Sequence, residues 1–220
     1  MQFILDKNAG EEILRVEGER HNHLFRSRRT KKSQSLYFRN LQDLYLYTYR
    51  IENLGKKEAT LKLINKELST LQNPPKAHLM WAIIDSKSIE KVLPTLNELN
   101  LAKITFFYAD FSQKNFKPDL ERMDRILENS CEQCGRITKL EIEILENLHK
   151  LCERYKDFAV FDFGGESLPY ALDIPLLIGA EGGFSQNERE FLKTKKTYSA
   201  KNCNILRSEN AAIFATSRLI

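Results

Sequence analysis

The first third of the chain alternates apolar and polar positions with the period of two that is typical of β-strands. This alternation covers residues 44–49 and 59–63, and residues 53–56 between them have the composition of a turn. Residues 13–16 predict a further strand. We therefore expect a small β-rich unit of about 70 residues, the size of a compact barrel that is only marginally stable alone.

A break in the pattern follows at residues 72–75, where Pro74 and Pro75 are consecutive. Consecutive prolines force an extended backbone and end any regular element that precedes them. We place the domain boundary there, which gives a β-rich unit of residues 1–73 and a second domain of residues 74–220.

Beyond the break, short apolar runs alternate with segments of helical period. Strands are predicted over residues 78–84, 104–108, 158–163, 174–178 and 204–206, and helices over residues 88–100, 118–134, 143–155, 186–195 and from about residue 209. Pro94 predicts a kink or a late start in the first helix, and Gly135 ends the second at its C′ position. This alternation predicts an α/β domain with a mostly parallel sheet covered on both faces.

Composition narrows the class of protein. Of the 220 residues, 42% are hydrophobic and 29% are charged, which supports a buried core and excludes a collagen-like or largely disordered chain. No apolar run in the sequence approaches the roughly 20 residues that span a bilayer. The N-terminus lacks the features of a secretion signal, and the four cysteines fit a reducing compartment, so we expect a soluble cytoplasmic protein without a membrane partner.

Positive charge is concentrated in the front of the chain. Residues 1–73 hold 14 Lys and Arg against 9 Asp and Glu, whereas residues 74–220 hold 20 against 21. Residues 20–39 contain no acidic residue and interleave aromatic side chains with cations, which include Arg20, Arg26, Arg28, Arg29, Lys31 and Lys32. Clustered cations with aromatics predict an RNA-binding surface. The alternative is a solvated loop whose aromatic side chains point into the core.

The most informative segment for chemistry is residues 174–188, in which a buried strand runs into three glycines around Glu181. Ser185 and Glu188 then form a capping box that starts a helix. Glycines at a strand end let the backbone approach a ligand closely, and Glu181 can accept from a ribose or a cationic group. The spacing matches neither standard nucleotide-phosphate loop. The alternative is a tight turn that needs glycine.

Charged and polar residues mark two further segments. Arg207 and Glu209 lie at a strand-to-helix transition, where an arginine suits an anion and the alternative is a surface ion pair beside a helix cap. Gln133 and Arg136 flank the glycine that ends the helix over residues 118–134 and can point into a shared cleft. The C-x-x-C beside them lacks the further ligands that zinc needs, and the four histidines have no metal-ligand spacing, so no metal site is predicted.

Three segments together resemble one family. Residues 177–185 read LIGAEGGFS, residues 205–212 read ILRSENAA and residues 132–136 read EQCGR. In order, spacing and the basic β-rich front, the chain resembles the RsmE-type 16S ribosomal RNA (uracil-N3)-methyltransferases of the SPOUT superfamily over essentially its whole length. It departs from the family's usual residues at Ala180, at Asn210 and at residues 112–114.

The resemblance implies an N-terminal PUA-like RNA-binding barrel and a C-terminal SPOUT methyltransferase domain with a trefoil knot. It implies homodimers and a bent S-adenosylmethionine held by Ile178, Gly179, Glu181, Gly182, Gly183, Ile205 and Leu206. The implied reaction is methylation of uracil N3 at a specific uridine in 16S rRNA of the small subunit. The N3 atom must lose its proton, so we expect cations to stabilise the anionic ring.

The expected catalytic residues are Arg136 and Arg207, which would hold the uracil or its phosphate, Gln133, which would read the base edge, and Glu209, which would orient Arg207. N3 lies on the pairing edge, so the target base must be unpaired or flipped out. Two alternatives are a SPOUT methyltransferase that acts on another RNA and a non-catalytic PUA-like RNA-binding protein.

Overall fold

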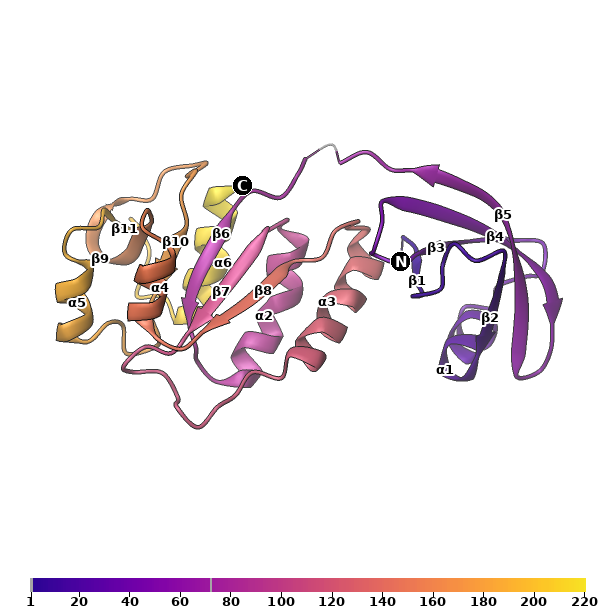
Figure 1. Ribbon diagram of the computed structural model, residues 1–220, viewed down its shortest axis with the longest axis horizontal. Helices are drawn as coiled ribbons and strands as arrows, with labels where there is room; N and C mark the ends of the chain where they lie inside the picture. Colours follow the sequence, from indigo (N-terminus) through magenta and orange to yellow (C-terminus); the bar gives the residue numbers. More distant parts are fainter. Residues whose placement is uncertain (1, 72) are drawn as a thin grey trace. The chain divides into compact units, whose positions relative to one another are not determined.

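The computed structural model describes residues 2–71 and 73–220, and it divides into two compact units (Figure 1). Unit 1 comprises Met1–Asn73 and Cys131–Thr138, and unit 2 comprises Pro74–Ser130 and Lys139–Ile220. Residues 131–138, which the sequence break assigns to the second domain, therefore group with the N-terminal residues. The reason is a pair of hydrogen bonds within unit 1. The backbone N–H of Gln2 donates to the carbonyl of Glu132 at 2.9 Å, and the backbone N–H of Leu5 donates to the carboxylate of Glu132 at 2.5 Å.

Unit 1 is built on a five-stranded sheet in the order β1-β3-β4-β5-β2. The strands are β1 (Ile4–Leu5), β2 (Ile13–Glu17), β3 (Ser35–Arg39), β4 (Tyr45–Leu54) and β5 (Glu58–Leu68). The predicted strands over residues 13–16, 44–49 and 59–63 are confirmed, and β1 and β3 were missed. Strand β4 explains the period of two over residues 44–49, because Tyr47 and Tyr49 lie on the same face of the strand and both point into the core.

A short helical segment follows β2 and carries part of the basic region. It consists of α1 (Gly18–His21) and the π-helical turn η1 (Asn22–Ser27). His21 and Leu24 are buried, and the imidazole Nε2 of His21 lies 3.1 Å from the carbonyl oxygen of Gly55 in the β4–β5 turn. The segment is therefore packed on the sheet rather than being a free loop.

Unit 2 is built on a six-stranded sheet in the order β11-β9-β10-β6-β7-β8, in which every pairing is parallel. The strands are β6 (His78–Ala82), β7 (Lys103–Phe107), β8 (Glu141–Leu145), β9 (Ala159–Ser167), β10 (Leu176–Ile178) and β11 (Thr197–Ser199). Their apolar runs are buried on both faces, as expected for a parallel sheet. The α/β class predicted from the sequence is confirmed.

Five helices accompany the sheet among the described residues of unit 2: α2 (Ser86–Glu98), α3 (Leu120–Cys134), α4 (Leu148–Arg154), α5 (Gln186–Leu192) and α6 (Ser208–Leu219). Helix α3 ends in unit 1, and its C′ residue Gly135 has a φ of 86°, as predicted. Pro94 lies inside α2. Figure 1 shows α6 beside α2 and strand β6, which agrees with their contacts. No helix among the described residues has both the length and the apolar character to cross a bilayer.

Two sequence-based element predictions are wrong. The helix predicted over residues 143–155 is instead strand β8, an edge strand, followed by α4. The strand begins the segment because Ile142 and Ile144 alternate with Glu141 and Glu143, and Asn147 then caps α4 by accepting from the backbone N–H of Lys150. The strand predicted over residues 204–206 is irregular, and the last strand of the sheet is β11.

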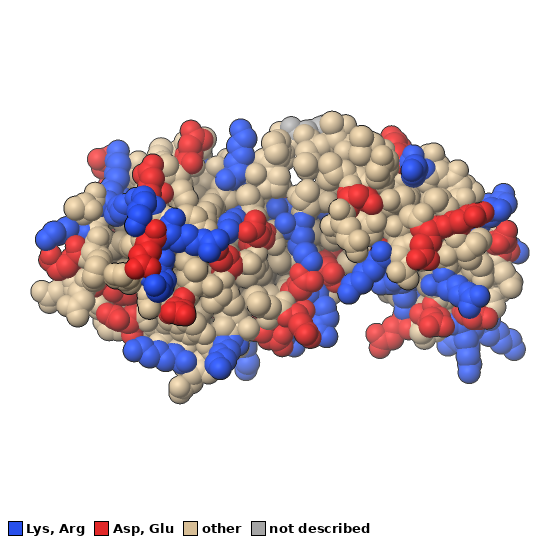
Figure 2. Space-filling model, in the orientation of Figure 1, with Lys and Arg blue, Asp and Glu red and all other residues tan. Residues whose placement is uncertain are grey.

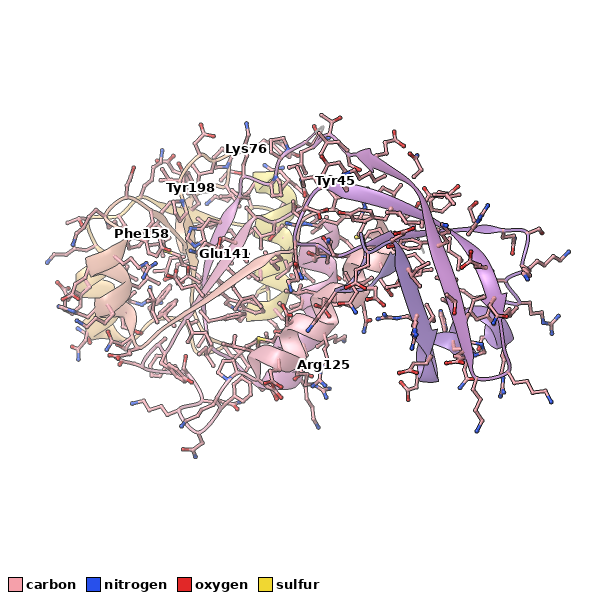
Figure 3. The ribbon with its side chains drawn as sticks, turned by 45° about the vertical axis from the view of Figure 1, so that its right-hand side comes forward. Tyr45, Lys76, Arg125, Glu141, Phe158 and Tyr198 are labelled. Atoms are coloured by element: carbon pink, nitrogen blue, oxygen red, sulfur yellow. The ribbon has the colours of Figure 1, made fainter. Side chains whose placement is uncertain are left out.

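A partly buried polar network joins β6, β7 and β8 on one face of this sheet. The hydroxyl of Thr105 donates to Glu143 at 2.7 Å, so it accepts from Nε2–H of His78 at 2.9 Å. The same carboxylate accepts from the hydroxyl of Tyr155 at 2.6 Å, and Lys103 pairs with Glu141, which Figure 3 labels. Burial, with a smaller effect from Lys103, lowers the pKa of His78 to about 4.

We expect acid to destabilise unit 2 through His78. Its pKa is about 4 in the folded state and roughly 6.5 when unfolded, so the unfolded chain binds the extra proton between these values. The free energy of unfolding is therefore highest above pH ~6.5, where the imidazole is neutral in both states. It falls by about 2 kcal/mol as the pH drops to ~5, because the unfolded chain then binds a proton that the folded chain does not. Urea unfolding of the wild type and of His78→Asn, measured at both pH values, tests this. Equal pH dependence of the two proteins would contradict it.

Candidate functional site

A cavity of about 310 Å³ lies where β9, β10 and β11 meet the loops that follow them. Its wall includes Phe161–Gly164 of β9, the loop that begins at Ile178, and a third segment that leads from β11 to α6. Strand β10 pairs with both β9 and β6, so the cavity lies at the carboxyl end of an interior strand of a parallel sheet. Open α/β sheets bind ligands at such ends.

A chain of buried hydrogen bonds holds the loop after β10 against the start of α6. The indole N–H of Trp81 donates to the hydroxyl of Ser208 at 2.8 Å, and this hydroxyl donates to the carbonyl of Gly179 at 2.7 Å. Trp81 is completely buried in β6. Ser208 is therefore an internal bridge, and the N-cap of α6 is Arg207, which makes no side-chain capping hydrogen bond.

The glycine loop folds back on itself at the edge of the cavity. The N–H of Gly183 donates to the carbonyl of Ala180 at 2.9 Å, and Gly183 has a φ of 71°. A Cβ on Gly179 would lie 3.1 to 3.3 Å from backbone atoms of Gly183. Glycine at 179 and 183 is thus explained by close backbone approach and by a left-handed conformation.

The predicted capping box at the start of α5 is present and also reaches a neighbouring loop. Ser185 accepts from the N–H of Glu188, whose carboxylate accepts from the N–H of Ser185 at 2.9 Å. The other oxygen of Glu188 accepts from the N–H of Asp110 at 3.0 Å, and the hydroxyl of Ser185 donates to the carboxylate of Asp110. Glu188 is buried, so this clamp fixes the loop after β7 to the glycine loop.

Most of the predicted cofactor residues line the cavity. These are Ile178, Gly179, Glu181, Gly183, Ile205 and Leu206. Gly182 does not line it, because the position of a Cβ on Gly182 faces the side chain of Phe111 at 3.1 to 3.3 Å. Ile205 is 81% exposed and lies in an irregular segment between β11 and α6.

The predicted catalytic residues do not line the cavity, and they belong to two units. Arg207 is exposed at the start of α6, and Glu209 is half-buried in its first turn with Oε2 lacking a hydrogen-bond partner among the described residues. No ion pair joins these two side chains in the described part of the chain. Gln133 and Arg136 belong to unit 1, where burial lowers the pKa of Arg136.

The basic region of residues 20–39 divides into exposed and buried parts. Exposed cations are Arg20, Arg26, Arg28, Arg29, Lys31 and Lys32. Arg20 pairs with Asp6, whereas Phe38 and Arg39 are buried, so the core-facing alternative is correct for part of this segment. Arg26 donates to the carbonyl of Lys56 at 3.4 Å, which adds Lys56 and Lys57 of the β4–β5 turn to the same surface. Figure 2 shows Lys and Arg side chains projecting at the right-hand edge of unit 1, with Asp and Glu side chains between them.

Some site residues were missed by the sequence analysis. Asp162, Phe163 and Gly164 line the cavity, although the sequence pattern predicts only a strand over residues 158–163. Asp162 also forms an ion pair with Arg189, whose Nε–H donates to the carbonyl of Phe184 at 3.1 Å. The available signal was two glycines after an apolar strand, the same signal that identified the loop at Gly179.

Metal chemistry has no group of side chains to support it in the described ranges, which contain no cluster of three or more His, Cys, Asp or Glu suited to an ion. Cys131 is buried beside Phe3 and Leu5, as expected for a small apolar helix residue, whereas Cys134 is exposed. No shared site therefore forms around the C-x-x-C.

Comparison with known proteins gives consistent matches. The family model of the RNA methyltransferase domain matches residues 71–220. Ribosomal RNA small subunit methyltransferase E of Helicobacter pylori strain 26695 is 43% identical over 222 residues, which cover 99% of this chain and 98% of that protein. The protein of the same name from Aquifex aeolicus is 23% identical and covers 99% of this chain and 98% of its own length.

Solved structures agree with these matches. A putative methyltransferase from Legionella pneumophila in complex with the bound cofactor SAM has a TM-score of 0.78 and 26% identity, and the match covers 100% of this chain and 97% of that one. A ribosomal RNA small subunit methyltransferase E from Neisseria gonorrhoeae bound to S-adenosyl methionine has a TM-score of 0.77 at 18% identity, covers 99% of this chain and 95% of that one, and supports the fold. From the family model and the full-length relatives, the chain belongs to the RsmE family of RNA methyltransferases.

Proposed function

We propose that this protein transfers a methyl group from S-adenosylmethionine to N3 of a specific uridine in 16S rRNA of the small ribosomal subunit. The observation that carries the proposal is the cavity at the end of β10, because its wall holds six of the seven residues expected to bind the cofactor. The full-length relative from Helicobacter pylori, named for the small-subunit rRNA, supports the choice of substrate.

The cavity suits S-adenosylmethionine by shape and charge. Gly179 and Gly183 leave no side chain between the loop backbone and a ligand, and mostly apolar residues line the rest. Glu181 and Asp162, which also pairs with Arg189, add carboxylates to the wall and Lys201 adds a cation, so the wall can pair with both the cationic and the anionic groups of the cofactor. When bound, the cofactor supplies a methyl group on a sulfonium. The chain would hold it through the backbone of Ile178, Gly179, Ile205 and Leu206, and orient it through Glu181 and Gly183.

The remaining chemistry falls to cations. Uracil N3 carries a proton between two carbonyls, so the base must lose that proton and gain a positive environment before transfer. Arg207 lies one residue before Ser208, which lines the cavity, and would hold the anionic ring or its phosphate. Arg136 would add a second cation, Gln133 would read the base edge, and Glu209 would accept from Arg207 when RNA is bound.

Unit 1 would bind the RNA. We propose that its five-stranded sheet is a PUA-like barrel and that the exposed cations of residues 20–32, together with Lys56 and Lys57, contact rRNA phosphates. We further propose that unit 2 contains a SPOUT trefoil knot, that the protein acts in the cytoplasm, and that two copies form a homodimer.

One experiment tests substrate, position and cofactor together. Purified protein is incubated with labelled S-adenosylmethionine and small subunits from a strain without the activity, and methylated rRNA is mapped by reverse-transcription arrest, since N3 methylation blocks pairing. An arrest at one uridine of 16S rRNA is expected. Label without an arrest would reassign the position, and cofactor binding without label would move the activity to another RNA.

We also expect the cofactor to shield a cysteine in the cavity. Cys203 is exposed and lines the cavity, whereas Cys134 is exposed in unit 1. Saturating S-adenosylmethionine should slow alkylation of Cys203 by N-ethylmaleimide about tenfold or more, because only the unbound fraction reacts. Peptide mass spectrometry follows both thiols, and Cys134 serves as the internal control. An equal rate at Cys203 with and without the ligand would place the cofactor elsewhere.

A further inference from the structure

An exposed aromatic ring lies directly against the glycine loop of the cavity. Phe111 follows β7 and is 54% exposed. Two of its ring atoms lie 3.1 and 3.2 Å from the position of a Cβ on Gly182. The two neighbours of Gly182, Glu181 and Gly183, both line the cavity. One side of the ring therefore covers the loop, and the rest faces solvent beside the candidate methyl-donor site.

The turn that carries this ring is held rigidly. The N–H of Ala109 donates to the hydroxyl of Ser112, and the N–H of Ser112 donates to the carbonyl of Ala109, each at 3.0 Å. Between them, Asp110 is held by both side chains of the α5 capping box. A single exposed aromatic is common on protein surfaces, but this ring is carried by a turn that four hydrogen bonds hold at the edge of a ligand cavity, which positions it for binding.

The surroundings favour an unpaired nucleobase over other partners. Aromatic rings stack on bases of any sequence, and single-stranded or flipped bases are recognised in this way. Lys114 and Lys117 follow in the same loop and are exposed, so they can neutralise the phosphates on either side of a stacked base. Glu181 is exposed on the cavity side of the glycine loop, which separates the apolar stacking face from the cationic cofactor.

We infer that Phe111 is a stacking platform on which a base of the RNA substrate is held beside the cofactor loop. The inference rests on the proposed function only in taking RNA as the substrate. Phe111 acts here as a positioning residue, because the chemistry at the base remains with the cations. Gly182 is then required for the ring to lie flat on the loop, which explains a glycine that does not line the cavity.

The test compares ring variants with a matched exposed aromatic. Phe111→Ala and Phe111→Leu should each lower kcat/KM for small subunits about 10- to 100-fold, whereas Phe111→Tyr should stay within about threefold of wild type. Phe191→Ala removes a ring that is 60% exposed on α5 and should change kcat/KM less than about twofold. The affinity for S-adenosylmethionine, measured by calorimetry, should be unchanged in every variant.

RNA binding is measured separately from methyl transfer, so that the stacking proposal is tested even if the proposed reaction fails. Titration of a 16S rRNA transcript in the presence of S-adenosylhomocysteine should show the same order of variants even if the wild type does not methylate small subunits. Wild-type RNA affinity in Phe111→Leu would overturn the stacking proposal. A parallel loss of cofactor affinity would reassign the ring to support of the loop, and conversion of a dimer to a monomer by Phe111→Ala would show that a second copy covers it.

Discussion

Replacing Arg207 by alanine should lower methyl transfer about 100- to 1,000-fold while leaving cofactor affinity within about threefold of wild type. Arg207 is exposed at the start of α6 and does not line the cavity, whereas its neighbours Leu206 and Ser208 do. We therefore propose that its guanidinium meets the substrate outside the cofactor cavity. Single-turnover transfer to small subunits gives the rate, and calorimetry with S-adenosylmethionine gives the affinity.

The conservative variant Arg207→Lys separates charge from geometry. Lysine keeps the positive charge but loses the planar fork that binds a uracil edge or a phosphate through two N–H groups, so only partial recovery of the rate is expected. Lys193→Ala, which removes the exposed C-cap cation of α5 that pairs with Glu190, should behave as wild type. Unchanged turnover in Arg207→Ala would remove this residue from the mechanism.

The parallel sheet was predictable because its interior strands are apolar on both faces and short. The error at residues 143–155 came from an edge strand, in which Glu141 and Glu143 pair with Lys103 rather than face the core. Because this strand is half-exposed and a helix follows it, the amphipathic pattern of the segment fits the period of a helix as well as that of a strand. Residues 204–206 fail for a different reason, since their conformation is set by the cavity wall and not by strand pairing.

The loop sequences predicted where the candidate site lies, but not how it is held together. The glycines after β10 could be found because a strand end followed by glycines has a local pattern. The supports are distant in sequence: Trp81 and Ser208 are separated by 127 residues, and Asp110 and Glu188 by 78. No periodicity connects such positions, because each bond depends on the order of strands in the sheet.

Replacing Gly179 by valine should weaken S-adenosylmethionine binding about 100-fold or more. The Cβ alone would lie 3.1 to 3.3 Å from the backbone of Gly183, so even alanine needs the loop to shift by a few tenths of an ångström. The two further methyl groups of valine have no room on that side and must project into the cavity, which overpacks the ligand space. Calorimetry with the cofactor measures the loss, and thermal unfolding verifies that the variant is folded.

Gly182→Ala is the matched control because it adds a methyl group two residues from the bend at Ala180 without facing the cavity. Its Cβ would meet the side chain of Phe111 at 3.1 Å, and an exposed ring can move where the backbone of Gly183 cannot. We therefore expect cofactor affinity within about threefold of wild type, with lower RNA affinity if Phe111 stacks on a base. Equal losses of cofactor affinity in the two variants would show that loop flexibility, rather than the close approach at Gly179, determines cofactor binding.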